Sequence, residues 1–292
     1  MPFISQLCLT IIQSIKKFSI WLYQHGLTKL VWHLSHCQWT WLKNRIIQAF
    51  ISHFQPNMLE AELTDPFEYV SFNALFTRKL KANARPLEGN EQHWLSPADG
   101  TLSQLHFIND GQLIQAKQHT YTCAALLGNH PEWQHSFNQG ISTTIYLAPF
   151  DYHRVHMPLS GRLRCMMHIP GNLYSVSLKT AAKIPNLFAK NERVVCIFDT
   201  NHGPLAIALI GATLVGSIEI SWHGLIRPKG HGKITQIDYP ADTGPYLQQG
   251  ELMGWFNYGS TVVCLLNNES EALHPWSIPC SIRYGQRLAD LS

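Results

Sequence analysis

Charged residues are scarce in this chain of 292 residues, because Asp, Glu, Lys and Arg make up only 14% of the sequence. Soluble globular proteins usually contain about 25%. So little charge leaves less solvated surface than such a protein normally has, which indicates an apolar partner. The formal net charge is only +3, and we expect no nucleic-acid partner.

Acidic residues are absent from positions 1–59, although the whole chain contains 19. The charged residues of this segment are all basic: Lys16, Lys17, Lys29, Lys43 and Arg45. It also contains four of the nine tryptophans: Trp21, Trp32, Trp39 and Trp41. Tryptophan and lysine without acid suit a helix that lies in the interface of an anionic bilayer.

Long apolar runs are missing as well. Within residues 1–59, the uncharged runs 1–15 and 30–42 are each shorter than the roughly 18 apolar residues of a membrane-spanning helix. Apolar residues within 4–15 recur at helical spacing, which predicts an amphipathic helix. The alternative is a helical cap that packs on the protein's own core.

The cysteine pattern excludes a disulfide framework and a zinc ribbon. Seven cysteines, an odd number, are scattered through the chain without a Cys-x-x-Cys pair. We therefore expect a reducing compartment, in which the thiols serve as small apolar side chains.

From residue 95 onward, short alternating or β-branched runs between glycines and prolines are typical of strands. Strands are predicted at 101–107, 143–147, 162–169, 194–198, 205–209, 213–220 and 261–266, and short helices at 73–80, 122–127 and 180–187. The predicted fold class is α+β. It comprises a mostly antiparallel β catalytic domain, residues 61–292, and an amphipathic helical membrane-associating segment, residues 1–60.

Common signatures of nucleotide, zinc and hydrolase sites are missing. The sequence contains no Gly-rich phosphate loop, no His-Glu-x-x-His motif and no Gly-x-Ser-x-Gly elbow. His153 and His156 lie three positions apart in Asp-Tyr-His-Arg-Val-His-Met-Pro. Zinc normally needs a third protein ligand, so no metal is expected. The histidines are either surface residues of a turn or acid–base groups.

Asp99 and Ser260 are the other candidate residues. Asp99 lies in Ser-Pro-Ala-Asp-Gly, where an aspartate ordinarily bonds its own turn but can also orient a histidine. Gly259-Ser260 directly precedes a buried, β-branched run. Taken alone, that pair is a loop-to-strand junction in which glycine supplies backbone freedom.

These three segments, in this order and at these wide separations, resemble the phosphatidylserine decarboxylase family, the bacterial membrane-associated type. The resemblance extends from about Asn57 to about Leu266. Four further segments are similar to the family: Ile169–Gly171, Pro185–Arg193, Val215–Glu219 and Gly250–Gly254.

The resemblance implies an inactive precursor that cleaves itself. Ser260 would attack the carbonyl of Gly259, His156 would act as general base, and Asp99 would hold the imidazole in the required tautomer. The acyl group would shift from nitrogen to oxygen, and β-elimination would then break the chain.

The implied products are a β chain, residues 1–259, and an α chain, residues 260–292, that begins with a pyruvoyl group derived from Ser260. Decarboxylation needs an electron sink, and no ordinary side chain has a ketone. The pyruvoyl group would form a Schiff base with phosphatidylserine and release CO2 and phosphatidylethanolamine, without PLP or a metal. His153 is the candidate for the proton transfer.

The implied partners are phosphatidylserine, an anionic membrane surface, and the two cleaved chains as a heterodimer that the low charge allows to dimerise further. The implied location is peripheral, on the cytoplasmic side of the inner membrane, in phospholipid biosynthesis. Deletion of residues 1–50 is expected to lower membrane partition while sparing self-cleavage.

Two positions depart from the family pattern. Tyr258 stands where the family commonly has leucine before Gly-Ser, which bears on processing. Phe150 stands where the family often has arginine, which removes a positive charge near an anionic head group.

Two alternatives stay open at this point. One is a hydrolase that uses the same Ser, His and Asp on an external ester or peptide. The other is an inactive membrane-binding homologue. A hydrolase remains one chain, whereas the decarboxylase becomes two.

Overall fold

The computed structural model describes residue 26 and residues 30–116, 119–212, 217–227, 232–257, 260–268 and 272–291. The helical spacing predicted within residues 4–15 lies outside the described residues, as do Tyr258 and Gly259. Within the described ranges, residues 30–35 are helical. The other helices are α2 (Thr40–Phe54), α3 (Phe72–Phe76), α4 (Cys123–Leu126), α5 (Leu178–Ala181) and α6 (Leu187–Lys190), with a 3-10 turn, η1 (Pro66–Glu68).

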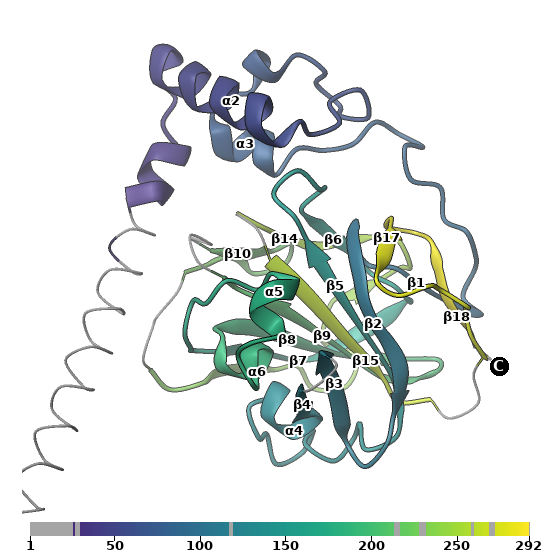
Figure 1. The fold of residues 1–292 in the computed structure, drawn as a ribbon. Helices are drawn as coiled ribbons and strands as arrows, with labels where there is room; N and C mark the ends of the chain where they lie inside the picture. The colour runs from purple at the N-terminus through teal and green to yellow at the C-terminus, as the bar shows by residue number, and fades with distance from the viewer. Residues whose placement is uncertain are drawn as a thin grey trace, which may run out of the picture.

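A large antiparallel sheet forms the centre of the molecule (Figure 1). Its strand order is β12 (Thr235–Asp238), β7 (Gly161–Ile169), β8 (Arg193–Thr200), β9 (Gly203–Ile210), β15 (Ser260–Leu266), β5 (Gly140–Leu147), β2 (Gly100–Ile108) and β17 (Cys280–Ile282), and β13 (Tyr246–Leu247) also pairs with β7. The segment that begins at Ser260 therefore lies in the middle of this sheet, hydrogen-bonded on both sides.

Strand β15 is buried on both faces, which explains its continuous apolar sequence. Alternate residues of a strand point to opposite faces. Accordingly, Val262 and Cys264 join one hydrophobic cluster, and Val263 and Leu265 join the other. The second cluster is covered by α4, α6 and the hairpin of β3 (Gln112–Ala116) and β4 (His119–Thr122).

Two smaller antiparallel sheets complete the β body. One has the order β11 (Gly224–Ile226), β10 (Ile218–Ile220), β14 (Leu252–Phe256) and β6 (Arg154–His156). The other has the order β1 (His93–Leu95), β18 (Arg287–Asp290) and β16 (Ala272–Leu273). Both contribute side chains to the first hydrophobic cluster of the large sheet.

Helices α2 and α3 form a separate layer beside the sheet of β6 and β14 (Figure 1). Phe50 of α2 packs on Phe72 and Phe76 of α3, with ring centroids 5.0 and 5.9 Å apart. Buried Lys43 donates from Nζ to the Phe67 carbonyl at 2.7 Å, so this lysine holds the layer together. Among the described residues, no helix is long and apolar enough to span a membrane.

The α+β fold class is confirmed, and strands occur in every predicted stretch. Residues 213–216 of the predicted strand 213–220 lie outside the described residues, and the strand there is β10. The helix predicted at 73–80 ends at Phe76, because residues 79 and 81 instead bond to residues 60 and 62. The helix predicted at 180–187 is divided into α5 and α6, with Pro185 between them.

The predicted boundary at residue 60 remains a prediction. One hydrophobic cluster joins Ile47 and Phe50 on one side of it to Leu75 and Phe76 on the other. A deletion of residues 1–50 would remove the α2 half of that cluster. We therefore no longer expect such a deletion to spare self-cleavage.

Candidate active site

Asp99 lies in the loop between β1 and β2 and is 7% exposed. Arg85 donates to its carboxylate from Nε, at 3.1 Å to each oxygen, and from Nη2, at 2.6 Å. The same Nη2 donates to Glu60 at 2.7 Å. Gly100 follows directly, and a Cβ there would lie 2.3 Å from the Tyr146 carbonyl oxygen, so the close approach of β2 to β5 requires glycine.

Tyr284 connects Asp99 to His156. Its backbone N–H donates to Asp99 Oδ1 at 2.9 Å. Its ring stacks on the His156 imidazole, with centroids 3.9 Å apart and planes 14° apart. Its hydroxyl donates to the Gly250 carbonyl at 3.0 Å. One tyrosine therefore contacts the carboxylate, the imidazole and the carbonyl that holds the imidazole.

His156, the last residue of β6, is fixed by hydrogen bonds at both ring nitrogens. Nδ1 lies 2.9 Å from the Gly250 carbonyl oxygen, and Nε2 lies 2.9 Å from the Tyr152 hydroxyl. A carbonyl only accepts, so Nδ1 carries the proton and Nε2 accepts from Tyr152. Burial lowers the pKa of His156 to about 4, an effect that the Gly250 bond opposes. The imidazole is thus neutral at pH 7, with Nε2 as its basic nitrogen.

In the described part of the chain, no hydrogen bond joins Asp99 to His156 or His156 to Ser260. The imidazole nitrogen that an aspartate would hold in a triad is held by the Gly250 carbonyl. The structure therefore brings Asp99 and His156 to the two sides of Tyr284 but not into direct contact. The triad remains a prediction.

His153 is fully buried and stacks on Phe76 of α3, with ring centroids 4.1 Å apart. Neither of its ring nitrogens forms a hydrogen bond of good geometry within the described ranges, although the Ala148 and Pro149 backbone lies near enough to oppose the fall in its pKa. Burial, with the nearby Arg78 cation, lowers the pKa of His153 to about 3. This histidine is a neutral, dry side chain, and the surface-turn interpretation does not apply to it.

Ser260 is the first residue of β15, fully buried, and it pairs with Leu147 of β5. Within the described ranges its hydroxyl has no hydrogen-bond partner. Gly259, the other half of the predicted cleavage site, lies outside the described residues. Just before it, Asn257 donates from Nδ2 to Ser217 Oγ at 2.6 Å and accepts from Asn73 of α3 at 3.1 Å. The chain before Ser260 is therefore tied to both the β body and the helical layer.

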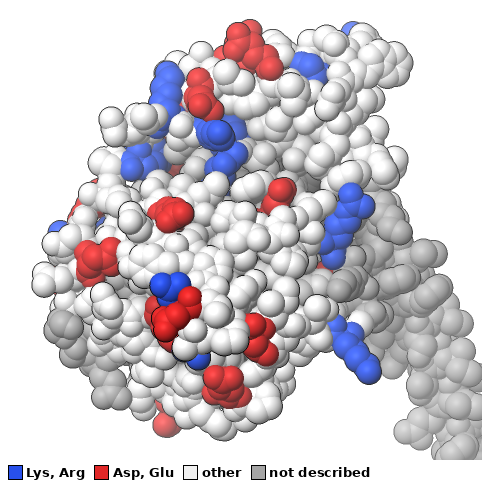
Figure 2. Space-filling view, turned by 180° about the vertical axis from the view of Figure 1, so that it is seen from behind, with Lys and Arg blue, Asp and Glu red and all other residues white. Residues whose placement is uncertain are grey.

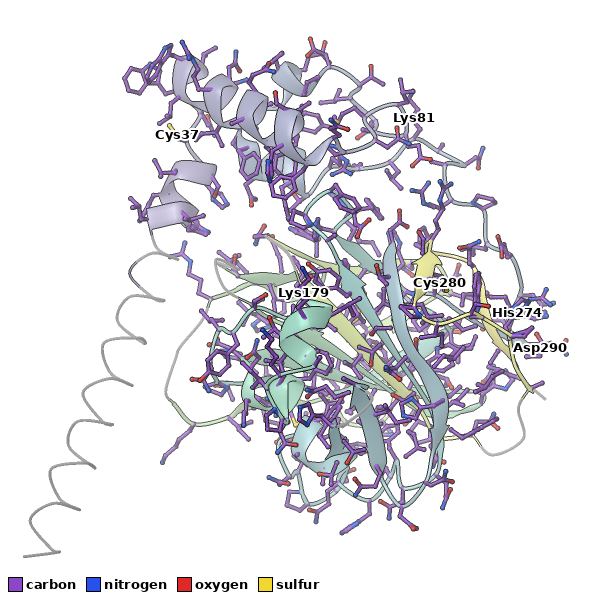
Figure 3. The ribbon with its side chains drawn as sticks, in the orientation of Figure 1. Cys37, Lys81, Lys179, His274, Cys280 and Asp290 are labelled. Atoms are coloured by element: carbon purple, nitrogen blue, oxygen red, sulfur yellow. The ribbon has the colours of Figure 1, made fainter. Side chains whose placement is uncertain are left out.

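A cavity of about 350 Å³ borders His156. Its walls carry four basic side chains and the two tyrosines that contact His156: Lys79, Lys81, Arg85, Arg154, Tyr152 and Tyr284. Lys81, labelled in Figure 3, lies on the connection between the α2–α3 layer and β1. Such a lining favours an anionic ligand.

Sequence reasoning missed Tyr284, Tyr152, Gly250 and Arg85 as parts of the site. No local motif marks the two tyrosines. Within the described ranges, no three His, Cys, Asp or Glu side chains come together as a metal centre would require.

Comparison with known proteins identifies the family. A profile described as phosphatidylserine decarboxylase matches residues 72–290, and a second, described as PSD, matches residues 22–55. The chain belongs to the phosphatidylserine decarboxylase family. The resemblance inferred from the three motifs is thereby confirmed.

Several relatives of similar length carry the name phosphatidylserine decarboxylase proenzyme. The protein from Vibrio parahaemolyticus is 47% identical over 252 residues, which cover 86% of this chain and 88% of the relative. The one from Alkalilimnicola ehrlichii is 48% identical over 244 residues, 84% and 85% of the two chains. The one from Stutzerimonas stutzeri is 44% identical over 269 residues, which cover 92% of this chain and 87% of the relative.

Proposed function

We propose that this chain is a proenzyme that cleaves itself between Gly259 and Ser260 and then decarboxylates phosphatidylserine to phosphatidylethanolamine. The observation that carries the proposal is the family match over residues 72–290. The buried hydroxyl of Ser260, which has no hydrogen-bond partner among the described residues, and the oriented, neutral His156 support it.

In self-cleavage, Ser260 Oγ attacks the carbonyl carbon of the preceding residue, and His156 Nε2 takes the hydroxyl proton. For this transfer the imidazole must exchange its hydrogen bond with Tyr152 for one with Ser260. Asp99 acts through Tyr284, whose backbone it anchors and whose ring lies on the imidazole. The acyl group then moves from nitrogen to the serine oxygen, and elimination frees residues 1–259 as a carboxylate and leaves dehydroalanine at position 260. Water then hydrolyses the dehydroalanine to the pyruvoyl group with loss of ammonia.

The pyruvoyl group that this reaction would leave at Ser260 supplies an electron sink for the electrons of the breaking carboxyl bond. The site fits such a group, because Ser260 is fully buried at the entrance of β15 and its oxygen has no competing partner in the described chain. His153 is the proposed group for the proton transfer that replaces CO2; because burial keeps its ring neutral, it must first gain a proton before it can donate one. Phe76 holds its ring in place.

The α2–α3 layer presents apolar side chains to solvent that suit the interface of a bilayer. Trp39 and Trp41 are 68% and 61% exposed, and Leu59 and Val70 are 79% and 63% exposed. Charged side chains are sparse between wide uncharged areas on the face in Figure 2. We place the protein at the cytoplasmic side of the inner membrane as a peripheral protein.

Intact mass tests the proposal. Purified wild-type protein is expected to give two chains, with residues 260–292 lacking the mass of ammonia and blocked at the N-terminus. Ser260→Ala is expected to stay whole and to release no CO2 from phosphatidylserine vesicles. Ser281→Ala, an exposed serine of the same segment, is the matched control and should behave as wild type.

Survival of both cleavage and CO2 release in Ser260→Ala would contradict the proposal. An uncleaved wild-type protein that hydrolyses esters would instead favour the hydrolase. A whole, catalytically silent protein that binds vesicles would favour the inactive homologue.

A further inference from the structure

Arg78, just after α3, is a buried arginine with an incomplete set of hydrogen bonds. It is 3% exposed, and its one hydrogen bond in the described chain runs from Nη2 to the Phe150 carbonyl at 3.0 Å. Its Nε and Nη1 have no partner among the described residues. Buried charged groups are ordinarily paired, so two idle donors on a guanidinium require an explanation.

Arg193 is a buried structural arginine whose guanidinium nitrogens all have hydrogen-bond acceptors. It is 2% exposed, and all three of its guanidinium nitrogens donate to backbone carbonyls at 2.7 or 2.8 Å: those of Leu126, Ala189, Asn191 and Ala125. By that standard, Nε and Nη1 of Arg78 still lack acceptors among the described residues.

No carboxylate of the described chain is close enough to Arg78 to form an ion pair. Asp99 is engaged by Arg85 and Tyr284. Asp151 accepts from the Ala148 N–H at 2.7 Å, and burial raises its pKa to about 6. Both acids affect Arg78 only through longer-range attraction. The missing acceptor therefore lies outside this set of residues, and the unpaired positive charge of Arg78 favours an anion in that place.

Arg78 lies beside the reaction centre. Its bonded neighbour, Phe150, belongs to the loop that joins β5 to β6. That loop begins after Leu147, the partner of Ser260, and contains His153. The Phe150 side chain is 47% exposed, so the same residue offers its carbonyl to Arg78 and an apolar ring to solvent.

We propose that Arg78 binds the phosphodiester of the phospholipid head group, an inference that rests on the function proposed above. The substrate has two candidate oxyanions, the phosphodiester and the serine carboxylate. The carboxylate must give up its charge as CO2 leaves, and an arginine paired with it would stabilise the ground state and slow the reaction. The phosphodiester keeps its charge throughout and suits the guanidinium fork. Arg78 thereby supplies a positive charge at the loop where Phe150 removes one.

The test uses cleaved, full-length enzyme with a short-chain phosphatidylserine as substrate and the matching phosphatidylethanolamine as inhibitor. The product has the phosphodiester but not the carboxylate. Arg78→Gln is expected to raise both the KM for the substrate and the inhibition constant of the product by about 10- to 100-fold, the range for hydrogen bonds to a charged group. Arg78→Lys should recover part of both. Arg162→Gln, which removes an arginine charge elsewhere, is the control and should change neither.

A rise in the KM with an unchanged product constant would assign Arg78 to the carboxylate and overturn the proposal. Unchanged values for both would overturn it as well. If neither variant cleaves itself, Arg78 serves processing, and the proposal again fails. A wild-type enzyme that cleaves itself but does not act on phosphatidylserine would instead refute the function proposed above.

Discussion

Replacement of Tyr284 is expected to slow self-cleavage. Tyr284→Phe removes only the hydroxyl that bonds the Gly250 carbonyl, and Tyr284→Leu also removes the ring that stacks on His156. The backbone N–H that bonds Asp99 remains in both variants. The pair of substitutions therefore separates two ways in which one residue orients the imidazole.

The contacts set the size of each effect. A neutral hydrogen bond contributes about 0.5–1.5 kcal/mol, and a stacked ring pair contributes about 0.5–1.5 kcal/mol. If the whole contribution acts on the orientation of His156, Tyr284→Phe slows cleavage by about 2- to 10-fold and Tyr284→Leu by about 5- to 150-fold, since 1.36 kcal/mol is tenfold in rate.

The assay follows the appearance of residues 260–292 by intact mass in freshly made protein. Tyr246→Leu is the control, because Tyr246 is an exposed tyrosine on β13 whose ring contacts Arg162 and not His156. A thermal melt of each variant in the Ser260→Ala background measures any loss of fold stability separately. This background keeps the chain whole, so stability and cleavage are not confused.

Cleavage of Tyr284→Leu at the wild-type rate would refute the positioning role. A slower rate accompanied by an equal loss of stability in the uncleaved background would point to the fold instead. The expected result is slower cleavage at unchanged stability. Tyr284→Leu should cleave most slowly, Tyr284→Phe at an intermediate rate and the wild type fastest.

Three further outcomes are expected. Self-cleavage should stay constant from about pH 8 to about pH 5 and fall below about pH 4, because His156 must be unprotonated and burial lowers its pKa to about 4; a midpoint near 6.5, the ordinary histidine value, would contradict this. The Trp39→Ala, Trp41→Ala double variant should bind anionic vesicles at least about tenfold more weakly in a sedimentation assay, since each ring buries about 150–250 Å², whereas Phe107→Ala on β2 should bind normally. Phe50→Ala should lower the free energy of unfolding by about 3–5 kcal/mol in denaturant titrations; a loss below about 1 kcal/mol would show that α2 contributes little.

The β body could be predicted because local patterns report burial directly. Strand β15 is apolar at successive positions since both faces of the sheet are covered. The ends of helices were harder to predict. Helix α3 stops early because residues 79–81 pair with residues 60–62, a long-range preference that outweighs local propensity.

The site could be predicted only as a set of residue types. The motifs and the family resemblance pointed to Asp99, His156 and Ser260, but they did not reveal which groups hold the imidazole. Tyr284 meets Asp99 across 185 positions and Gly250 meets His156 across 94. The Gly250 contact uses a backbone carbonyl, whose direction depends on the folded chain and not on the residue type. Contacts between residues so far apart in the chain produce no characteristic spacing that could be recognised in a single sequence.

The proposed self-cleavage breaks one peptide bond, but the two resulting chains stay bound to each other. Strand β15 is paired along its length with β5 and β9, β17 with β2, and β18 with β1. Every one of those partners belongs to residues 1–259. The two chains are therefore expected to copurify and to separate only in denaturant. Tyr284 belongs to the small chain, and His156 to the large one. After cleavage, the new chain end at Ser260 and the Tyr284 ring that orients His156 both remain in the interface between the two chains. The fold that positions the groups for self-cleavage is therefore expected to position them for decarboxylation as well.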